Sequence, residues 1–240
     1  MRVAVRSLGL SDVAPFDPAK KVVEEVLRDP DALVEQPVRR FVDMTSAGTA
    51  VPGGGSASAL AAAQAAALLA MVANLSAVAR GLEPRRAELA GLAIEAQAAK
   101  EAMLAAVDAD SRAYASVMEA RRLPKTTSAE KESRLSALAA ASATAAAVPL
   151  SVLEKTIPLL EIASHLLGAG LEASLSDTGV AAAQAAAAAE GACYNVLVNL
   201  PGLADPLEAE RTRARAIELC ERARHLAADI RAVAHGRLRT

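Results

Sequence analysis

The sequence predicts an all-α protein that folds as an antiparallel helical bundle with broken helices. Hydrophobic residues make up 53% of the 240-residue chain, but aromatic residues make up only 2%. Alanine and leucine, both strong helix formers, therefore supply most of the apolar surface. Apolar positions recur at helical spacing, and no useful stretch alternates as a strand would. Because alanine buries little area, such a core needs many close helices, which favours a homodimer.

Residues 1–36 are predicted to form an arm or linker, because they are too few to enclose a core. Asp17-Pro18 predicts a helix start, and Ala19–Leu27 carries apolar residues at helical spacing. Asp29-Pro30 then interrupts that pattern. We assign the remainder, residues 37–240, to one helical domain.

Proline and glycine signals divide the helical domain into several elements. Two of its expected helices are rich in alanine, and Pro149 is expected to kink or restart the chain. The first alanine-rich helix is long enough to cross a bilayer. It is interrupted by Gln64 and Asn74, so a helix buried in protein, without membrane association, is expected. The expected helices are Pro37–Ala47, Ala57–Ala79, Pro84–Glu119, Ser128–Ala147, Val152–Leu167, Asp177–Leu200 and Pro206–Ala234.

Charge and cysteine usage argue against several classes of function. The net charge is −2 and the pI is about 6.0, and tryptophan is absent. The chain thus offers neither a basic field nor an aromatic platform for nucleic acid. Cys193 and Cys220 are isolated, and no Cys/His cluster has the spacing of a metal site. Met1–Leu10 lacks the apolar core of a signal peptide, so a cytoplasmic location with reduced thiols is expected.

A glycine-rich turn, Pro52-Gly53-Gly54-Gly55-Ser56, directly precedes the first alanine-rich helix. Three consecutive glycines are entropically costly, so they indicate that the backbone approaches another group closely. A helix start also offers unpaired N–H groups and partial positive charge to a carboxylate or phosphate. The alternative is a flexible turn into a buried helix, because the pattern is neither a Walker loop nor a dinucleotide-binding fingerprint.

Asp110 is the leading candidate for acid–base chemistry. Met103, Val107, Asp110, Tyr114 and Val117 form one helical stripe, with the carboxylate in the middle of its apolar members. A carboxylate facing a bundle interior has a raised pKa, as a general acid/base requires near neutral pH. The alternative is a buried aspartate that binds a helix end. Asp108 lies off this stripe, and we expect an ordinary surface pair with Arg112.

Asp177, Asn195, Asn199 and Asn74 are weaker candidates. Asp177 lies in Ser176-Asp177-Thr178, a pattern that is foremost typical of a helix cap. The alternative is that the Asp177 carboxylate enters a cleft at the helix start. Asn195 and Asn199 are one turn apart on an otherwise apolar helix, and Asn74 stands late in the first alanine-rich helix. Buried amides need partners, so these residues are expected to bind loop backbone, each other or a planar ligand.

Together, four segments in this order resemble the cyclodeaminase/cyclohydrolase family over about residues 37–235. In that family the domain stands alone or forms the C-terminal half of a bifunctional formiminotransferase-cyclodeaminase. Residues 6–10 and 14–18 resemble the end of a glutamate formiminotransferase domain, so such a domain or protein is a candidate partner. The four segments are Pro52–Ser56, Met71–Leu75, Ser176-Asp177 and Asn195–Leu200.

The resemblance implies ring closure of 5-formiminotetrahydrofolate to 5,10-methenyltetrahydrofolate with loss of ammonia. For that reaction our hypothesis is that Asp110 moves the proton, with Asp177 as a second acid or pterin anchor. The substrate would be held by Pro52, Gly53, Gly54, Gly55, Ser56, Asn74, Asn195 and Asn199, with no metal or other cofactor. The alternatives are a methenyltetrahydrofolate cyclohydrolase and a non-catalytic helical dimerisation module.

Overall fold

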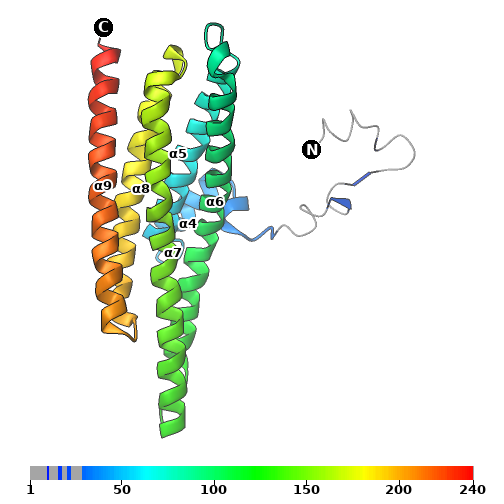
Figure 1. The fold of residues 1–240 in the computed structure, drawn as a ribbon. Helices are drawn as coiled ribbons and strands as arrows, with labels where there is room; N and C mark the ends of the chain where they lie inside the picture. Colours follow the sequence, from blue (N-terminus) through cyan, green and yellow to red (C-terminus); the bar gives the residue numbers. More distant parts are fainter. Residues whose placement is uncertain (1–9, 11–15, 18–20, 23–28, 240) are drawn as a thin grey trace.

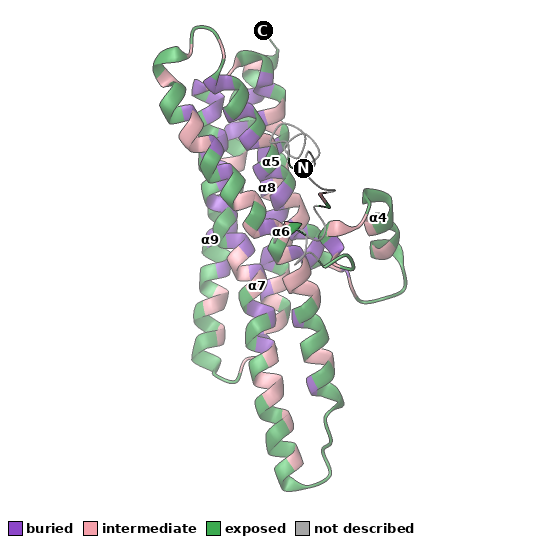
Figure 2. Cartoon of the chain, turned by 90° about the vertical axis from the view of Figure 1, so that its right-hand side faces the viewer, coloured by how far each residue is buried: buried purple, intermediate pink, exposed green. Residues whose placement is uncertain are grey.

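The computed structural model describes residues 10, 16–17, 21–22 and 29–239. Within them the chain forms helices and no strand, which confirms the predicted all-α class. The five long helices lie side by side, and the short α4 lies to one side of them (Figures 1 and 2), with Phe41 and Met44 packed against the core. The predicted arm helix at Ala19–Leu27 falls almost wholly outside the described residues. The helices are α4 (Val38–Ser46), α5 (Gly54–Ala77), α6 (Arg86–Arg122), α7 (Ser128–Ala169), α8 (Leu175–Asn199) and α9 (Pro206–Leu238).

Helix α5 forms the centre of the bundle. It packs against α6, α7 and α8, and fourteen of its 24 residues are buried. Small side chains such as Ala62 and Ala66 let these helix backbones approach closely (both are fully buried). Helices α5 and α7 are each long and apolar enough to cross a membrane, but 61% of the α5 window is buried inside the bundle.

Helix α7 differs from the sequence prediction, because it runs without interruption from Ser128 to Ala169. The predicted restart of the helix at Pro149 is therefore wrong, and Pro158 also lies inside the helix. A proline in a helix leaves the carbonyl four residues earlier without its N–H partner. For Pro149 that carbonyl belongs to Ala145, and it accepts a 2.9 Å hydrogen bond from Asn199 Nδ2 of α8. Packing and this side chain together stabilise the continuous helix.

The α6–α7 hairpin projects beyond the turn that joins α8 to α9 (Figure 1). A capping box begins α7, in which the Thr127 hydroxyl accepts from the Glu130 N–H and the Glu130 carboxylate accepts from the Thr127 N–H. The N-terminal arm ends against α6, because Leu33 is buried and its N–H donates to Asp108 Oδ1 at 2.7 Å. The expected surface pair between Asp108 and Arg112 is therefore wrong.

Candidate functional site

The glycine-rich turn brings its backbone against two side chains from other helices. Helix α5 begins at Gly54, inside the glycine run, three residues before the predicted start. A Cβ at Gly55 would lie 2.0 Å from Asp110 Oδ1, and one at Gly54 would lie 3.4 Å from Asn195 Nδ2. The predicted close approach is thus confirmed, since Gly55 has no space for a side chain.

Asp110 of α6 lies at the start of α5, where Ser56 holds its carboxylate. Ser56 Oγ is 2.9 Å from Asp110 Oδ2, 3.0 Å from the Val107 carbonyl oxygen and 3.1 Å from Ser111 Oγ. Burial raises the pKa of Asp110, and hydrogen bonds from the Ser56 side chain and main chain partly oppose that rise. Asp110 thus binds a helix end, as the structural alternative expected. It also faces a cavity, which capping alone does not require.

This cavity has a volume of about 350 Å³ and is lined from all four central helices and the glycine-rich turn. Among the described residues, Asp110 is the only acid and Arg121 the only base that lines it, and both belong to α6. Tyr114, one of two tyrosines in the chain, lines it between them and is 40% exposed. The size suits a small-molecule site with few polar groups. Its other lining residues include Gly53, Gly54, Gly55, Asn195 and Asn199.

Asn195 and Asn199 line the cavity from the end of α8, and their Nδ2 groups donate to main-chain carbonyls. Asn195 Nδ2 donates to the Gly191 carbonyl at 2.7 Å. Asn199 Nδ2 donates to the carbonyls of Asn195 and Ala145 at 2.8 and 2.9 Å. The groups available to a ligand are therefore both amide oxygens and the second N–H of Asn195 Nδ2. Both asparagines thus have a structural role as well as a place in the site.

Asp177 and Asn74 are not brought into this cavity. Asp177 lies in the first turn of α8, so 18 residues, or about 27 Å of helix, separate it from Asn195. Asn74 is exposed near the end of α5, twenty residues and about 30 Å from Gly54. Because α5 and α8 are antiparallel, these two residues share the other end of the helix pair. Within one chain they belong to a different location from Asp110.

Tyr114 and Arg121 line the site but were not among the predicted site residues. The stripe that identified Asp110 continues through both, since they follow it by four and eleven residues on one face of α6. In the sequence Tyr114 is an apolar member of that stripe, and Arg121 lies beyond the predicted helix end at Glu119. The extension of α6 to Arg122 is what places Arg121 on the cavity wall.

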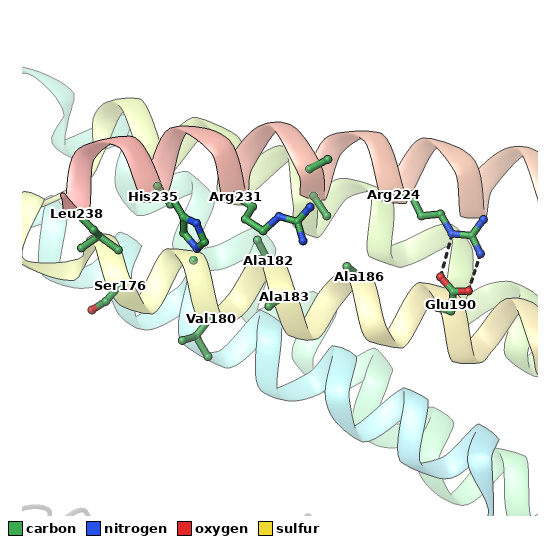
Figure 3. Close-up of a pocket in the computed structure, with 14 residues that line it drawn as sticks. Ser176, Val180, Ala182, Ala183, Ala186, Glu190, Arg224, Arg231, His235 and Leu238 are labelled. Carbon is green, nitrogen blue, oxygen red and sulfur yellow. Dashed lines mark hydrogen bonds and ion pairs between the residues drawn. The ribbon is translucent and has the colours of Figure 1, made fainter.

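A larger cavity, of about 860 Å³, follows the seam between α8 and α9. Figure 3 shows Arg231 and His235 extending from α9 towards the alanines of α8. The acid that lines it, Glu190, is bound by Arg224 Nε and Nη2 at 2.9 and 2.5 Å, which holds the pKa of Glu190 down at about 2. The described lining of this cavity therefore offers no carboxyl that could exchange a proton near neutral pH. Among the described residues no cluster of histidine, cysteine and acids could hold a metal ion.

The sequence is similar to a known family and to proteins of known name. A family model described as formiminotransferase-cyclodeaminase matches residues 37–218. The chain is 36% identical to mouse formimidoyltransferase-cyclodeaminase over 231 residues, which covers 95% of this chain and 43% of that protein. It is 32% identical over 173 residues to methenyltetrahydrofolate cyclohydrolase of Methylorubrum extorquens, covering 72% of this chain and 83% of that one. The chain thus spans less than half the length of the mouse protein.

A solved structure resembles the fold as well. The crystal structure of formiminotetrahydrofolate cyclodeaminase from Thermotoga maritima superposes with a TM-score of 0.69 at 25% sequence identity. The match covers 85% of this chain and 96% of the Thermotoga chain. The similarity therefore extends over nearly the whole helical domain.

Proposed function

The chain belongs to the formiminotransferase-cyclodeaminase family, and on that premise we propose that it converts 5-formiminotetrahydrofolate to 5,10-methenyltetrahydrofolate and ammonia. The observation that carries this proposal is the pairing of Asp110 with the glycine-rich turn in one cavity. A partly buried carboxyl with a raised pKa, beside the main-chain N–H groups of a helix start, suits the transfer of a proton.

In the proposed reaction the substrate nitrogen N10 attacks the formimino carbon attached to N5. Asp110 removes the proton from N10 and delivers it to the nitrogen of the formimino group, which leaves as ammonia. The bond from N10 to carbon forms, the bond from carbon to the leaving nitrogen breaks, and the methenyl cation keeps the single positive charge of the protonated substrate. No electron is exchanged, so the proposed reaction needs no redox cofactor.

The other cavity residues have positioning roles in this proposal. The hydroxyl of Ser56 donates to Asp110 when Asp110 is ionised, and it can accept from Asp110 when the carboxyl is protonated, because Val107 offers its carbonyl as the other partner. The amide oxygens of Asn195 and Asn199 accept hydrogen bonds from the substrate's ring N–H groups. The ring of Tyr114 packs against an aromatic part of the folate.

The alternative activity is hydrolysis of the methenyl product, as named for the Methylorubrum relative. The deaminase is favoured because relatives named formimidoyltransferase-cyclodeaminase align with 93–95% of this chain, including residues before the helical domain. Purified protein should release ammonia from 5-formiminotetrahydrofolate faster than it hydrolyses 5,10-methenyltetrahydrofolate. The reverse ranking would identify a cyclohydrolase, and activity on neither would favour the non-catalytic helical module.

We also propose that the working form is a homodimer that pairs through the α5–α8 face. Apart from Asp177 and Glu190, this face carries no charged residue from either helix, both of which are described throughout. Its exposed apolar side chains include Met71, Leu75, Val180, Tyr194 and Val198, which are 39–71% exposed. A monomeric protein rarely leaves so long an apolar strip in water.

The proposed dimer would also bring Asp177 and Asn74 of one chain to the Asp110 cavity of the other. Gln64 and Gln184 hydrogen-bond at 3.3 Å near the middle of the α5–α8 face, and Gln64 lies ten residues from both Gly54 and Asn74. A two-fold axis through this point would set Asp177 and Asn74 of one chain against Asp110 and the glycine-rich turn of its partner. Asp177 can act as a second acid or pterin anchor only in this way. A cytoplasmic location and a formiminotransferase partner remain predictions.

A further inference from the structure

Arg121 is the cation that lines the cavity of Asp110, and no acidic side chain of the described residues neutralises it. Its guanidinium makes no ion pair in that part of the chain, although nearly every other ion pair there joins an arginine to a glutamate. It lies eleven residues after Asp110 on the same face of α6, which is about 16 Å along the helix axis. Side chains on a helix lean on average towards its N-terminus, which for Arg121 is the direction of Asp110.

A second cavity continues from the first at Arg121. It has a volume of about 570 Å³, shares Val117 and Arg121 with the site, and has no acid among the described residues that line it. Arg134 of α7 lines it, and its Nε and Nη2 both donate to the Arg121 carbonyl at 3.3 Å. These hydrogen bonds hold the Arg134 guanidinium at the Arg121 main chain, in a cavity that Arg121 also lines, and they use only two of its five N–H donors.

On the basis of the proposed function, we infer that Arg121 binds a carboxylate of the glutamate tail of the folate substrate, and that Arg134 extends this anionic subsite. N10 belongs to the p-aminobenzoyl group, so a substrate with N10 at Asp110 must send its tail away from that point. The tail carboxylates are repelled by ionised Asp110 and attracted by Arg121. The row Asp110, Tyr114, Val117 and Arg121 then gives the order of contacts: reacting nitrogen, ring, ring edge and carboxylate.

The test compares two substrates in three proteins. The substrates are 5-formiminotetrahydrofolate and 5-formiminotetrahydropteroate, which lacks the glutamate. The proteins are the wild type, Arg121→Gln and Arg122→Gln, whose exposed arginine has the same charge and neighbouring position but lines neither cavity. A charge-assisted hydrogen bond predicts that Arg121→Gln raises KM for the glutamate-bearing substrate about tenfold and leaves kcat unchanged. The pteroate should show no change, and Arg122→Gln should resemble the wild type with both substrates.

Three results would overturn the inference. One is an unchanged KM in Arg121→Gln, and another is an equal loss with both substrates, which would indicate a general structural effect. If the wild type turns over neither substrate, the proposed function fails. Calorimetric binding of p-aminobenzoylglutamate then tests, without turnover, whether Arg121 binds the glutamate carboxylate. Wild-type binding that is lost in Arg121→Gln, with p-aminobenzoate as the glutamate-free control, would support the subsite. No binding by the wild type would end it.

Discussion

Gly55 occupies the position at which any side chain would displace the carboxylate of Asp110. The Cβ of an alanine there would lie 2.0 Å from Oδ1 and 2.5 Å from Cγ. Two helices are thus joined at a point where one contributes only backbone and the other an acid. The contact ties the start of α5 to the middle of α6 and fixes the acid at the cavity.

Gly55→Ala should therefore separate Asp110 from the glycine-rich turn. We expect a loss of stability of about 1–3 kcal/mol from the overpacked contact, and a larger fall in turnover than the lost stability explains. Gly91→Ala is the matched control, because a methyl group added at Gly91 of α6 would meet no described atom within 4 Å, and alanine should stabilise the helix there by about 0.5–1 kcal/mol. Thermal melts and steady-state kinetics of both variants test this. A fully active Gly55→Ala protein would contradict the proposed site.

Asp110→Asn should keep the fold and lose the proton transfer. The asparagine oxygen can still accept from Ser56, so the start of α5 remains capped. A lost general acid/base predicts a fall in kcat of about 10²–10⁴-fold. Asp108→Asn is the control, because Asp108 accepts from the Leu33 N–H and lies outside the cavity. Near wild-type turnover by a folded Asp110→Asn protein would remove Asp110 from the mechanism.

Ser56→Ala should move the acid limb of the pH–rate profile to higher pH. The hydrogen bonds from Ser56 lower the pKa of Asp110, against the larger effect of burial, so removal of the hydroxyl leaves the pKa further raised. Asp110 must be ionised to accept the N10 proton, and activity is therefore lost as pH falls through its pKa. With a higher pKa that loss begins at a higher pH. A profile that stays in place or moves to lower pH would exclude this coupling.

Asn199→Ala should destabilise the protein because it leaves the carbonyl freed by Pro149 without a donor. An unsatisfied buried carbonyl costs about 1–3 kcal/mol. In a Pro149→Ala background residue 149 regains an N–H for Ala145, so the same asparagine substitution should cost less. Denaturant melts of the four proteins give the coupling energy. Equal costs in both backgrounds would show that Asn199 and Pro149 act independently.

The proposed dimer predicts complementation between two inactive variants. Asp110→Asn and Asp177→Asn should each lose activity as homodimers. If the two acids of a site come from different chains, random mixing should restore about a quarter of the wild-type rate, because half of the dimers then carry one intact site. Sedimentation should show dimers before and after mixing. Persistent inactivity of the exchanged mixture would exclude a site shared between chains, and a monomer would exclude the pairing itself.

Much of the fold could be predicted because the helix boundaries have local signals. Proline and glycine mark the ends of α4, α5 and α8, and Pro206 begins α9 as expected. The unbroken α7 could not be predicted, because the partner of the Ala145 carbonyl is a side chain 54 residues away. The helix propensity of a segment contains no information on a contact between residues so far apart in sequence.

The candidate site was predicted in part for the same reason. Spacing placed Asp110 on an inward face of its helix, and three adjacent glycines indicated a close approach. The spacing of residues along one helix does not show which residues of a second helix lie beside them. Asp177 was therefore grouped with Asp110, although α8 holds it at the far end, and Arg121 was passed over because it stands near a helix terminus.

The uncharged α5 has a consequence for how the chain is made. Gln64 of α5 and Gln184 of α8 are 120 residues apart in sequence. The ribosome therefore completes α5 long before it synthesises α8, which packs against α5 in the folded protein. During that interval a segment of membrane-spanning length is shielded mainly by α6, the next helix to emerge. Early formation of the α5–α6 hairpin, which Asp110 and Ser56 fasten, would therefore protect the nascent protein from aggregation and from mistaken delivery to a lipid bilayer.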